Sequence, residues 1–108
     1  MISRAFRMQL KPGTVDEYKR RHDELWPDLA AALKQAGIYD YSIFLDESSL
    51  SLFAVLKLTP DNQADQLPQQ AVMQRWWDYM ADLMEVEADG VPRNRPREWP
   101  LQPLFYLA

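Results

Sequence analysis

The chain holds one histidine, His22, within the segment YKRRHDELWP (residues 18–27). Tyr18 lies four residues before it and Trp26 four residues after it, so on a helix the three side chains share one face. An imidazole has an ordinary pKa of about 6.5, which suits it to accept and donate protons near neutral pH. The alternative role is structural, because an isolated histidine at the border of an apolar stripe is more often part of the packing.

Two further sets of residues, a pair of tryptophans and a pair of tyrosines, carry a polar group on an aromatic ring. Trp76 and Trp77 are adjacent, and neighbouring helical positions differ by about 100° in direction. One indole is therefore expected to pack on a sheet while the other reaches sideways toward the first helix, the alternative being two core tryptophans. Tyr18 and Tyr41 present hydroxyls, which bind a ligand in one interpretation and are hydrated by water in the other.

Several other chemistries are excluded or disfavoured by composition. The sequence has no cysteine, so disulfides, thiolate nucleophiles and cysteine metal sites are excluded. It has three glycines and no glycine-rich phosphate loop, which argues against a nucleotide cofactor. His22 is followed by Asp23 and Glu24, but these lie on other helix faces and make no metal-ligand set. We therefore expect neither a metal nor a cofactor.

Charge and hydropathy limit the kinds of partner that the chain is expected to bind. The net charge of −4 would repel a phosphate backbone, and the one basic cluster, PRNRPRE (residues 92–98), is interpreted as a solvated loop. No apolar run approaches the roughly 18 residues of a membrane span. Arg4 and Arg7 interrupt the apolar residues near the N-terminus, so no signal-peptide core is expected. Neither a nucleic acid nor a membrane is expected as a partner.

The chain is expected to form one domain, residues 1–108, which has four strand-like segments. Alternating or continuous apolar residues predict strands over 2–10, 38–46, 50–58 and 101–108. Pro103 confines the last of these to a sheet edge. The turn formers of residues 46–49 predict a hairpin between the second and third strands.

Two helices are predicted between these strands. Thr14 and Glu17 have the spacing of a capping box, and Gly37 supplies a left-handed stop for the same helix. Pro27 inside it predicts a bend near Trp26. The second helix runs from Pro68 to Met84, and the proline- and charge-rich residues 85–100 that follow lack any periodicity.

The resulting order, β-α-β-β-α-β, is that of the ferredoxin-like class, an α+β fold with an antiparallel sheet. Right-handed crossovers place both helices on one face. His22 and Tyr18 then face the same layer as Trp76 and Trp77, and Tyr41 joins them if its side of the strand faces the helices. The residues alone thus predict an aromatic cleft with one titratable group.

The segments YKRRHDELWP, YSIFLD (41–46), QRWWDYM (74–80) and FYL (105–107) together resemble the L-rhamnose mutarotase family from Ile2 to Leu107. The resemblance implies a cytoplasmic, homodimeric isomerase of the dimeric α+β barrel type that interconverts the α and β anomers of L-rhamnose without a cofactor. It further implies that His22 is the general acid–base and that the sugar contacts are Tyr18, Tyr41, Trp76 and Trp77. Residues 60–70 and 85–100 depart from the family pattern, and the second of these segments is rich in proline and arginine.

Two other classes of protein are also compatible with these residues. A cofactor-independent monooxygenase or haem-degrading enzyme on the same barrel would tolerate a similar cleft. A non-catalytic ligand-binding module of ferredoxin-like form would use His22 for affinity only.

Overall fold

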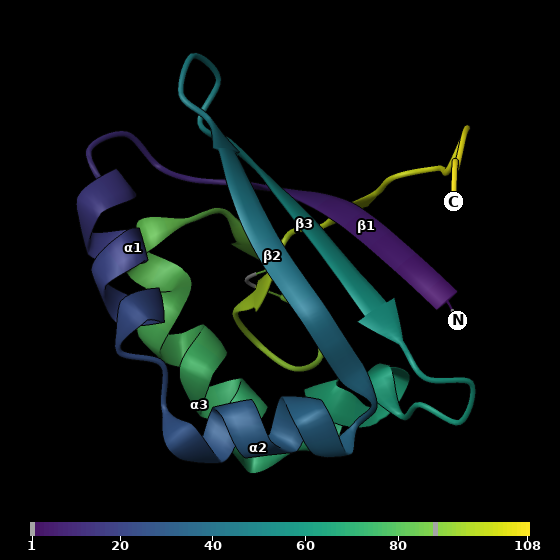
Figure 1. Ribbon diagram of the computed structural model, residues 1–108. Coiled ribbons are helices and arrows are strands. Elements are labelled where there is room, and N and C mark those ends of the chain that lie inside the picture. The colour runs from purple at the N-terminus through teal and green to yellow at the C-terminus, as the bar shows by residue number, and fades with distance from the viewer. Residues whose placement is uncertain (1, 88) are drawn as a thin grey trace.

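The computed structural model describes residues 2–87 and 89–108, which form an antiparallel sheet covered by helices (Figure 1). The sheet has the strand order β2-β3-β1-β6, and every pairing in it is antiparallel. Its strands are β1 (Ile2–Gln9), β2 (Ile38–Asp46), β3 (Ser51–Leu58) and β6 (Trp99–Pro100). The predicted α+β class with an antiparallel sheet is confirmed.

The helices lie between the strands in sequence and follow the predicted pattern in outline. They are α1 (Val15–Asp23), α2 (Pro27–Gln35) and α3 (Ala71–Met80), with short 3₁₀ turns η1 (Ala64–Gln69) and η2 (Ala81–Leu83) on either side of α3. Pro27 is the first residue of α2, so the bend predicted near Trp26 is confirmed as a break between two helices. The second predicted helix is shorter than expected, because Pro68 lies inside η1 rather than starting α3.

One face of the sheet carries the core. On the central strand β3 the alternate residues Leu52, Ala54, Leu56 and Leu58 are buried, whereas Val55 on the opposite face is 42% exposed. The buried row packs with the apolar stripe of α3 and with Leu29 of α2. The predicted central position of β3 is confirmed. No helix of the described residues covers the opposite face of the sheet.

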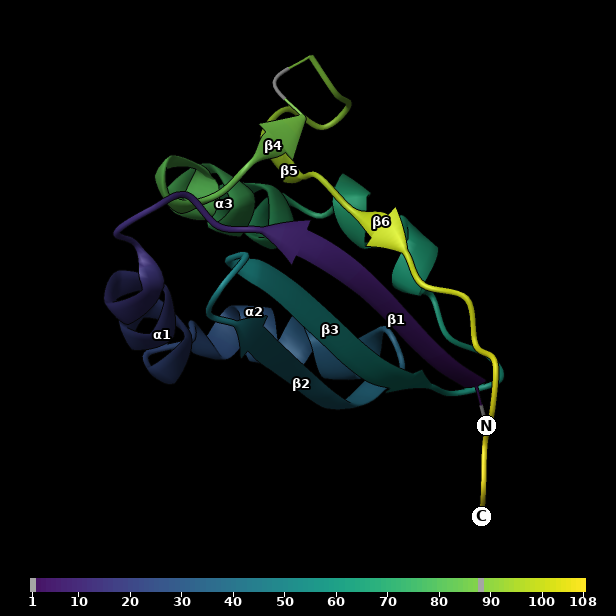
Figure 2. The same cartoon turned by 90° about the horizontal axis from the view of Figure 1, so that it is seen from above.

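The predicted C-terminal strand is wrong in position. Residues 101–108 have no regular structure, and the end of the chain extends away from the body of the molecule in both views (Figures 1 and 2). The edge strand is instead β6, which pairs Trp99 with Arg7 and Pro100 with Phe6. The last bond on this edge runs from the Leu101 N–H to the Ala5 carbonyl, at 3.0 Å. Pro103 has no N–H with which to continue the ladder.

Residues 85–87 and 89–100 contain more regular structure than their composition indicates. They contain a two-stranded ribbon, β4 (Val86–Glu87) paired with β5 (Arg95–Pro96), followed by β6. The Trp99 ring lies under the guanidinium of Arg7, 3.9 Å from the ring centroid. The ribbon and the contact of Trp99 with β1 therefore hold this part of the chain against the sheet. The interpretation of residues 92–98 as a solvated loop is wrong.

The capping box predicted for Thr14 and Glu17 is also wrong. The Thr14 hydroxyl makes no cap bond and instead lies 2.8 Å from the Lys11 carbonyl and 3.0 Å from the Leu83 carbonyl. Glu17 pairs with Arg20 and Arg21. Thr14 thus joins the start of α1 to the end of η2, which is a tertiary contact that local spacing does not reveal.

Candidate active site

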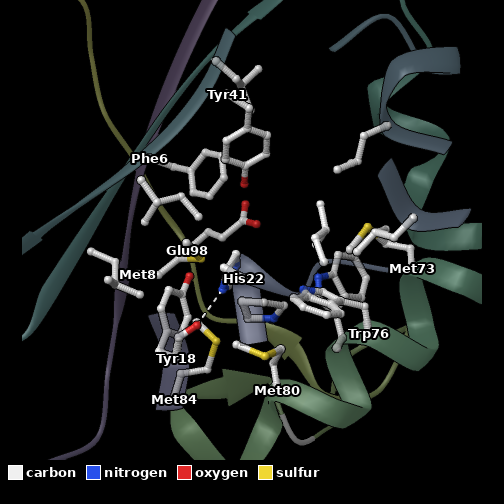
Figure 3. Close-up of a pocket in the computed structure, with 18 of the residues that line it drawn as sticks. Phe6, Met8, Tyr18, His22, Tyr41, Met73, Trp76, Met80, Met84 and Glu98 are labelled. Carbon is white, nitrogen blue, oxygen red and sulfur yellow. Dashed lines mark hydrogen bonds between the residues drawn. The ribbon is translucent and has the colours of Figure 1, made fainter. Parts of the chain in front are cut away.

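A pocket of about 960 Å³ opens between the helix-covered face of the sheet, α1 and α3 (Figure 3). All five residues predicted for the site line it: Tyr18, His22, Tyr41, Trp76 and Trp77. They come from α1, β2 and α3, so the fold brings together side chains that are up to 59 positions apart in sequence (77 − 18). Aliphatic and methionine side chains such as Met8, Met73 and Met84 form much of the remaining wall.

The orientation of His22 is set by its own helix. Its Nδ1 atom lies 3.0 Å from the Tyr18 carbonyl oxygen one turn earlier (dashed line in Figure 3). A carbonyl only accepts, so Nδ1 carries the hydrogen, and the neutral ring keeps Nε2 as its acceptor. Burial lowers the pKa of His22 below its ordinary value, with the Tyr18 carbonyl and Asp23 opposing this to a smaller extent. The imidazole is therefore neutral near pH 7 and able to act as a base.

Aromatic rings enclose this imidazole. The Tyr18 ring lies 4.3 Å from it between centroids, and the Trp76 ring lies 5.3 Å away in an edge-on arrangement of 89°. Trp76 in turn contacts Trp26 edge-on, at 5.1 Å. The rings surround His22 with low-polarity surface, which explains the direction of its pKa shift.

Trp76 and Trp77 are both core residues and pocket residues. Only 6% and 9% of their surfaces are exposed, and both line the pocket. Trp76 reaches sideways to His22 on α1, and Trp77 lies 5.7 Å from the Arg95 guanidinium. The two interpretations made from the sequence therefore hold together, since the indoles fill the core and also form a wall of the cavity.

The two tyrosines differ in their surroundings. Tyr18 is almost fully buried, and burial raises the pKa of its hydroxyl. Tyr41 follows Asp40, whose φ of 48° marks a register shift in β2 between Tyr39 and Ser42. The residue is 38% exposed and lines the cavity. Burial of the hydroxyl, and then the charge of Glu98, raise its pKa. Both phenols stay protonated at neutral pH and can donate or accept hydrogen bonds.

Glu98 is a pocket residue that the sequence did not reveal. It lies between β5 and β6, is half-buried, and points into the cavity (Figure 3). Burial raises the pKa of its carboxyl group, and Arg95 and Arg4 oppose the change. The polar segment around Glu98 has no periodicity that would place its side chain on an inner face. The adjacent Trp99 is the one sequence signal that this part of the chain packs against the fold.

Other kinds of site find little support. Among residues 2–87 and 89–108 no three histidine, aspartate or glutamate side chains lie close enough to hold a metal ion. Within the same residues, no helix is long and apolar enough to cross a bilayer. The pocket is lined by a neutral imidazole, two phenols, indole walls and several charged side chains, Glu98 among them. These groups suit proton transfer on a small polyhydroxylated molecule with some apolar surface.

Comparisons with known proteins agree with this chemistry. The sequence model of the L-rhamnose mutarotase family matches residues 3–107. Over 103 residues, which are 95% of both chains, the sequence is 57% identical to an L-rhamnose mutarotase of Acidiphilium cryptum. It is 56% identical over the same share to one of Burkholderia cenocepacia. The crystal structure of L-rhamnose mutarotase from Formosa agariphila superposes over the whole of both chains, with a TM-score of 0.89 and 41% identity.

These matches do not favour the monooxygenase and ligand-binding alternatives, since the family model and the relatives agree on one name over nearly the whole length. The chain belongs to the L-rhamnose mutarotase family.

Proposed function

We propose that the protein is an isomerase that interconverts the α and β anomers of L-rhamnose, with His22 as its general acid–base. The observation that carries the assignment of His22 is the bond from its Nδ1 to the Tyr18 carbonyl. Among residues 2–87 and 89–108 this leaves Nε2 without a hydrogen-bond partner, beside Trp76 in the pocket. A base held in one tautomer, with a lowered pKa, is ready to take a proton at neutral pH.

The reaction needs two proton transfers and one bond cleavage. Nε2 of His22 removes the proton of the anomeric hydroxyl, the C1–O5 bond breaks, and a proton is delivered to O5, which leaves the open-chain aldehyde. Rotation about C1–C2 and the reverse transfers close the other anomer. The imidazolium formed in the first step holds the proton that O5 requires, so the imidazole is regenerated and no net acid or base is consumed.

The required acceleration is modest. A positioned acid–base group typically contributes roughly 10²–10⁴-fold, equivalent to about 3–5 kcal/mol of barrier. Ring opening proceeds in water without a catalyst, so this contribution together with positioning suffices. Neither a metal nor a cofactor has a step to perform in this scheme.

The remaining pocket residues are proposed as sugar contacts. Trp76 and Trp77 offer indole faces to the C–H groups and to the methyl group of a 6-deoxy sugar, and indole N–H groups to its hydroxyls. Tyr18 and Tyr41 orient hydroxyls, because each phenol both donates and accepts. Their positions on the pocket wall support these roles.

We further propose a cytoplasmic homodimer of the ferredoxin-like, dimeric α+β barrel type. The strand order β2-β3-β1-β6 supports the fold type. The uncovered sheet face carries Phe44, 63% exposed, and Val55, 42% exposed, and the C-terminal tail exposes 80–90% of Leu104, Phe105, Tyr106 and Leu107. Apolar surface of this kind is rarely left in water, and a second copy of the chain is the partner we assign to it.

Light scattering tests the dimer. The intact chain should give twice the mass of 12.7 kDa, and deletion of residues 104–108 should lower that value toward the monomer. An intact chain with the monomer mass would contradict the assignment.

NMR magnetisation transfer between the two anomeric protons of L-rhamnose tests the activity. Catalytic amounts of protein should accelerate the exchange, and His22→Gln should remove roughly 10²–10⁴-fold of the acceleration while leaving the circular dichroism spectrum unchanged. Arg20→Met, at an exposed position on the same helix, is the control and should retain the activity. Exchange that does not accelerate even at high protein concentration would refute the proposal.

A further inference from the structure

The carboxyl group of Glu98 occupies a position in the pocket that none of the roles above uses. It enters from the segment between β5 and β6, and β6 pairs with β1 at the edge of the sheet. Figure 3 shows the carboxylate and the hydroxyl of Tyr41 pointing toward one another inside the cavity, and the charge of Glu98 acts on the Tyr41 hydroxyl. Glu98 and Tyr41 thus form a pair of polar side chains in the cavity that is separate from His22 and Tyr18.

The position of Glu98 is fixed by its neighbours. Pro96, two residues earlier, is buried and pairs with Val86 in the ribbon. Trp99, the next residue, pairs with Arg7 across the sheet edge and lies under its guanidinium. The main chain is therefore held on both sides of Glu98, and its side chain has little freedom to leave the cavity.

The chemistry of a carboxylate limits what it can bind there. When ionised it only accepts hydrogen bonds, and it has capacity for about four. The structure gives the Glu98 side chain no hydrogen bond or ion pair among residues 2–87 and 89–108, although Arg4 and Arg95 also line the pocket. An acceptor in this place suits a ligand that brings hydrogen-bond donors, and the hydroxyls of a sugar are such donors.

We propose that Glu98 is a specificity-determining residue that accepts hydrogen bonds from one or two sugar hydroxyls, with Tyr41 beside it as a second partner. This inference rests on the proposed function, because it assigns a contact to the same substrate. In this arrangement His22 contacts the hemiacetal group of the sugar, and Glu98 contacts hydroxyls elsewhere on the ring. Its charge also disfavours sugars that carry a carboxylate or phosphate at that position.

The test compares Glu98→Ala, Glu98→Gln and Glu87→Gln in the anomer-exchange assay at several L-rhamnose concentrations. Loss of a hydrogen bond to a charged acceptor should raise KM roughly 10- to 100-fold in Glu98→Ala, with a smaller change in kcat. Glu98→Gln keeps an acceptor and should lie between wild type and Glu98→Ala. Glu87 is an exposed residue of the same ribbon, so Glu87→Gln should leave both constants unchanged.

A set of monodeoxy analogues of L-rhamnose separates contact from packing. The analogue that lacks the hydroxyl bound by Glu98 should give the same KM with wild type and with Glu98→Ala, whereas the other analogues should keep the difference. A purely structural role would raise KM equally for every sugar, and unchanged KM in Glu98→Ala would also overturn the inference. Either result leaves the mutarotase assignment intact provided that the wild type accelerates exchange. An inactive wild type would instead overturn the proposed function and the inference that rests on it.

Discussion

Arg21 joins the helix that carries His22 to the helix that carries Trp76, and its removal should weaken that junction. Its side chain is only 12% exposed. Nη1 donates to the Tyr79 carbonyl at 2.7 Å and to Asp82 at 2.9 Å, and the guanidinium lies 4.4 Å from the centroid of the Tyr79 ring. Arg21→Met keeps the apolar stem of the side chain and removes these interactions together.

The expected loss of stability is the sum of the interactions that Arg21 makes with its partners. A bond to a carbonyl contributes about 1 kcal/mol, a cation–π contact about 0.5–1 kcal/mol, and an ion pair with a mostly exposed carboxylate such as Asp82 about 0.2–1 kcal/mol. We expect Arg21→Met to lower the free energy of unfolding by about 2 kcal/mol, out of roughly 5–15 kcal/mol for a domain of this size.

Urea unfolding followed by tryptophan fluorescence measures this loss. Arg20→Met is the matched control, since Arg20 pairs with Glu17 on its own helix and with Glu24 at the C-cap, and its side chain is 55% exposed. Arg20→Met should lose less stability than Arg21→Met, because its two ion pairs are exposed to solvent and lie within α1 and its C-cap. Equal midpoints for Arg20→Met and Arg21→Met would refute the view that Arg21 clamps the two helices.

Two further predictions concern stability. Gly37→Ala should destabilise the fold by about 1–3 kcal/mol more than Gly13→Ala in the same assay. Both glycines have positive φ, but a Cβ at Gly37 would clash with the Thr59 hydroxyl oxygen, whereas a Cβ at Gly13 would meet nothing within 4 Å. Equal losses for the two variants would show that the clash is not the cause. The lowered pKa of His22 should make the wild type lose stability as the pH falls from about 6.5, the unfolded-state value, through its folded-state pKa, with no change above that window. His22→Gln should lack this component in unfolding measured from pH 8 to 5, and parallel curves for the two proteins would contradict it.

The sequence predicted the elements whose signals are local. The bend at Pro27 follows from a missing backbone donor, and the positive φ of Gly37 follows from the absence of a side chain. The central place of β3 follows from its apolar character on both faces. The five predicted site residues line one pocket because the order of elements places α1, β2 and α3 around it.

What the sequence could not predict depends on pairing between distant segments. The edge strand is Trp99–Pro100 because Arg7 and Phe6 of β1 receive it, and nothing near Trp99 specifies that register. The inward direction of Glu98 has the same origin. Thr14 looked like a cap because of its spacing to Glu17, but the Leu83 carbonyl, 69 residues away in the chain, competes for its hydroxyl.

The partner that orients His22 is a main-chain carbonyl rather than a side chain. A point substitution at Tyr18 can replace the phenol, yet it leaves that oxygen in place as long as the helix persists. Random mutagenesis should therefore seldom yield variants with an intact imidazole in the opposite tautomer. An engineer who wanted a more basic catalyst would have to introduce a carboxylate against Nδ1, since the described residues offer no orienting side chain to exchange.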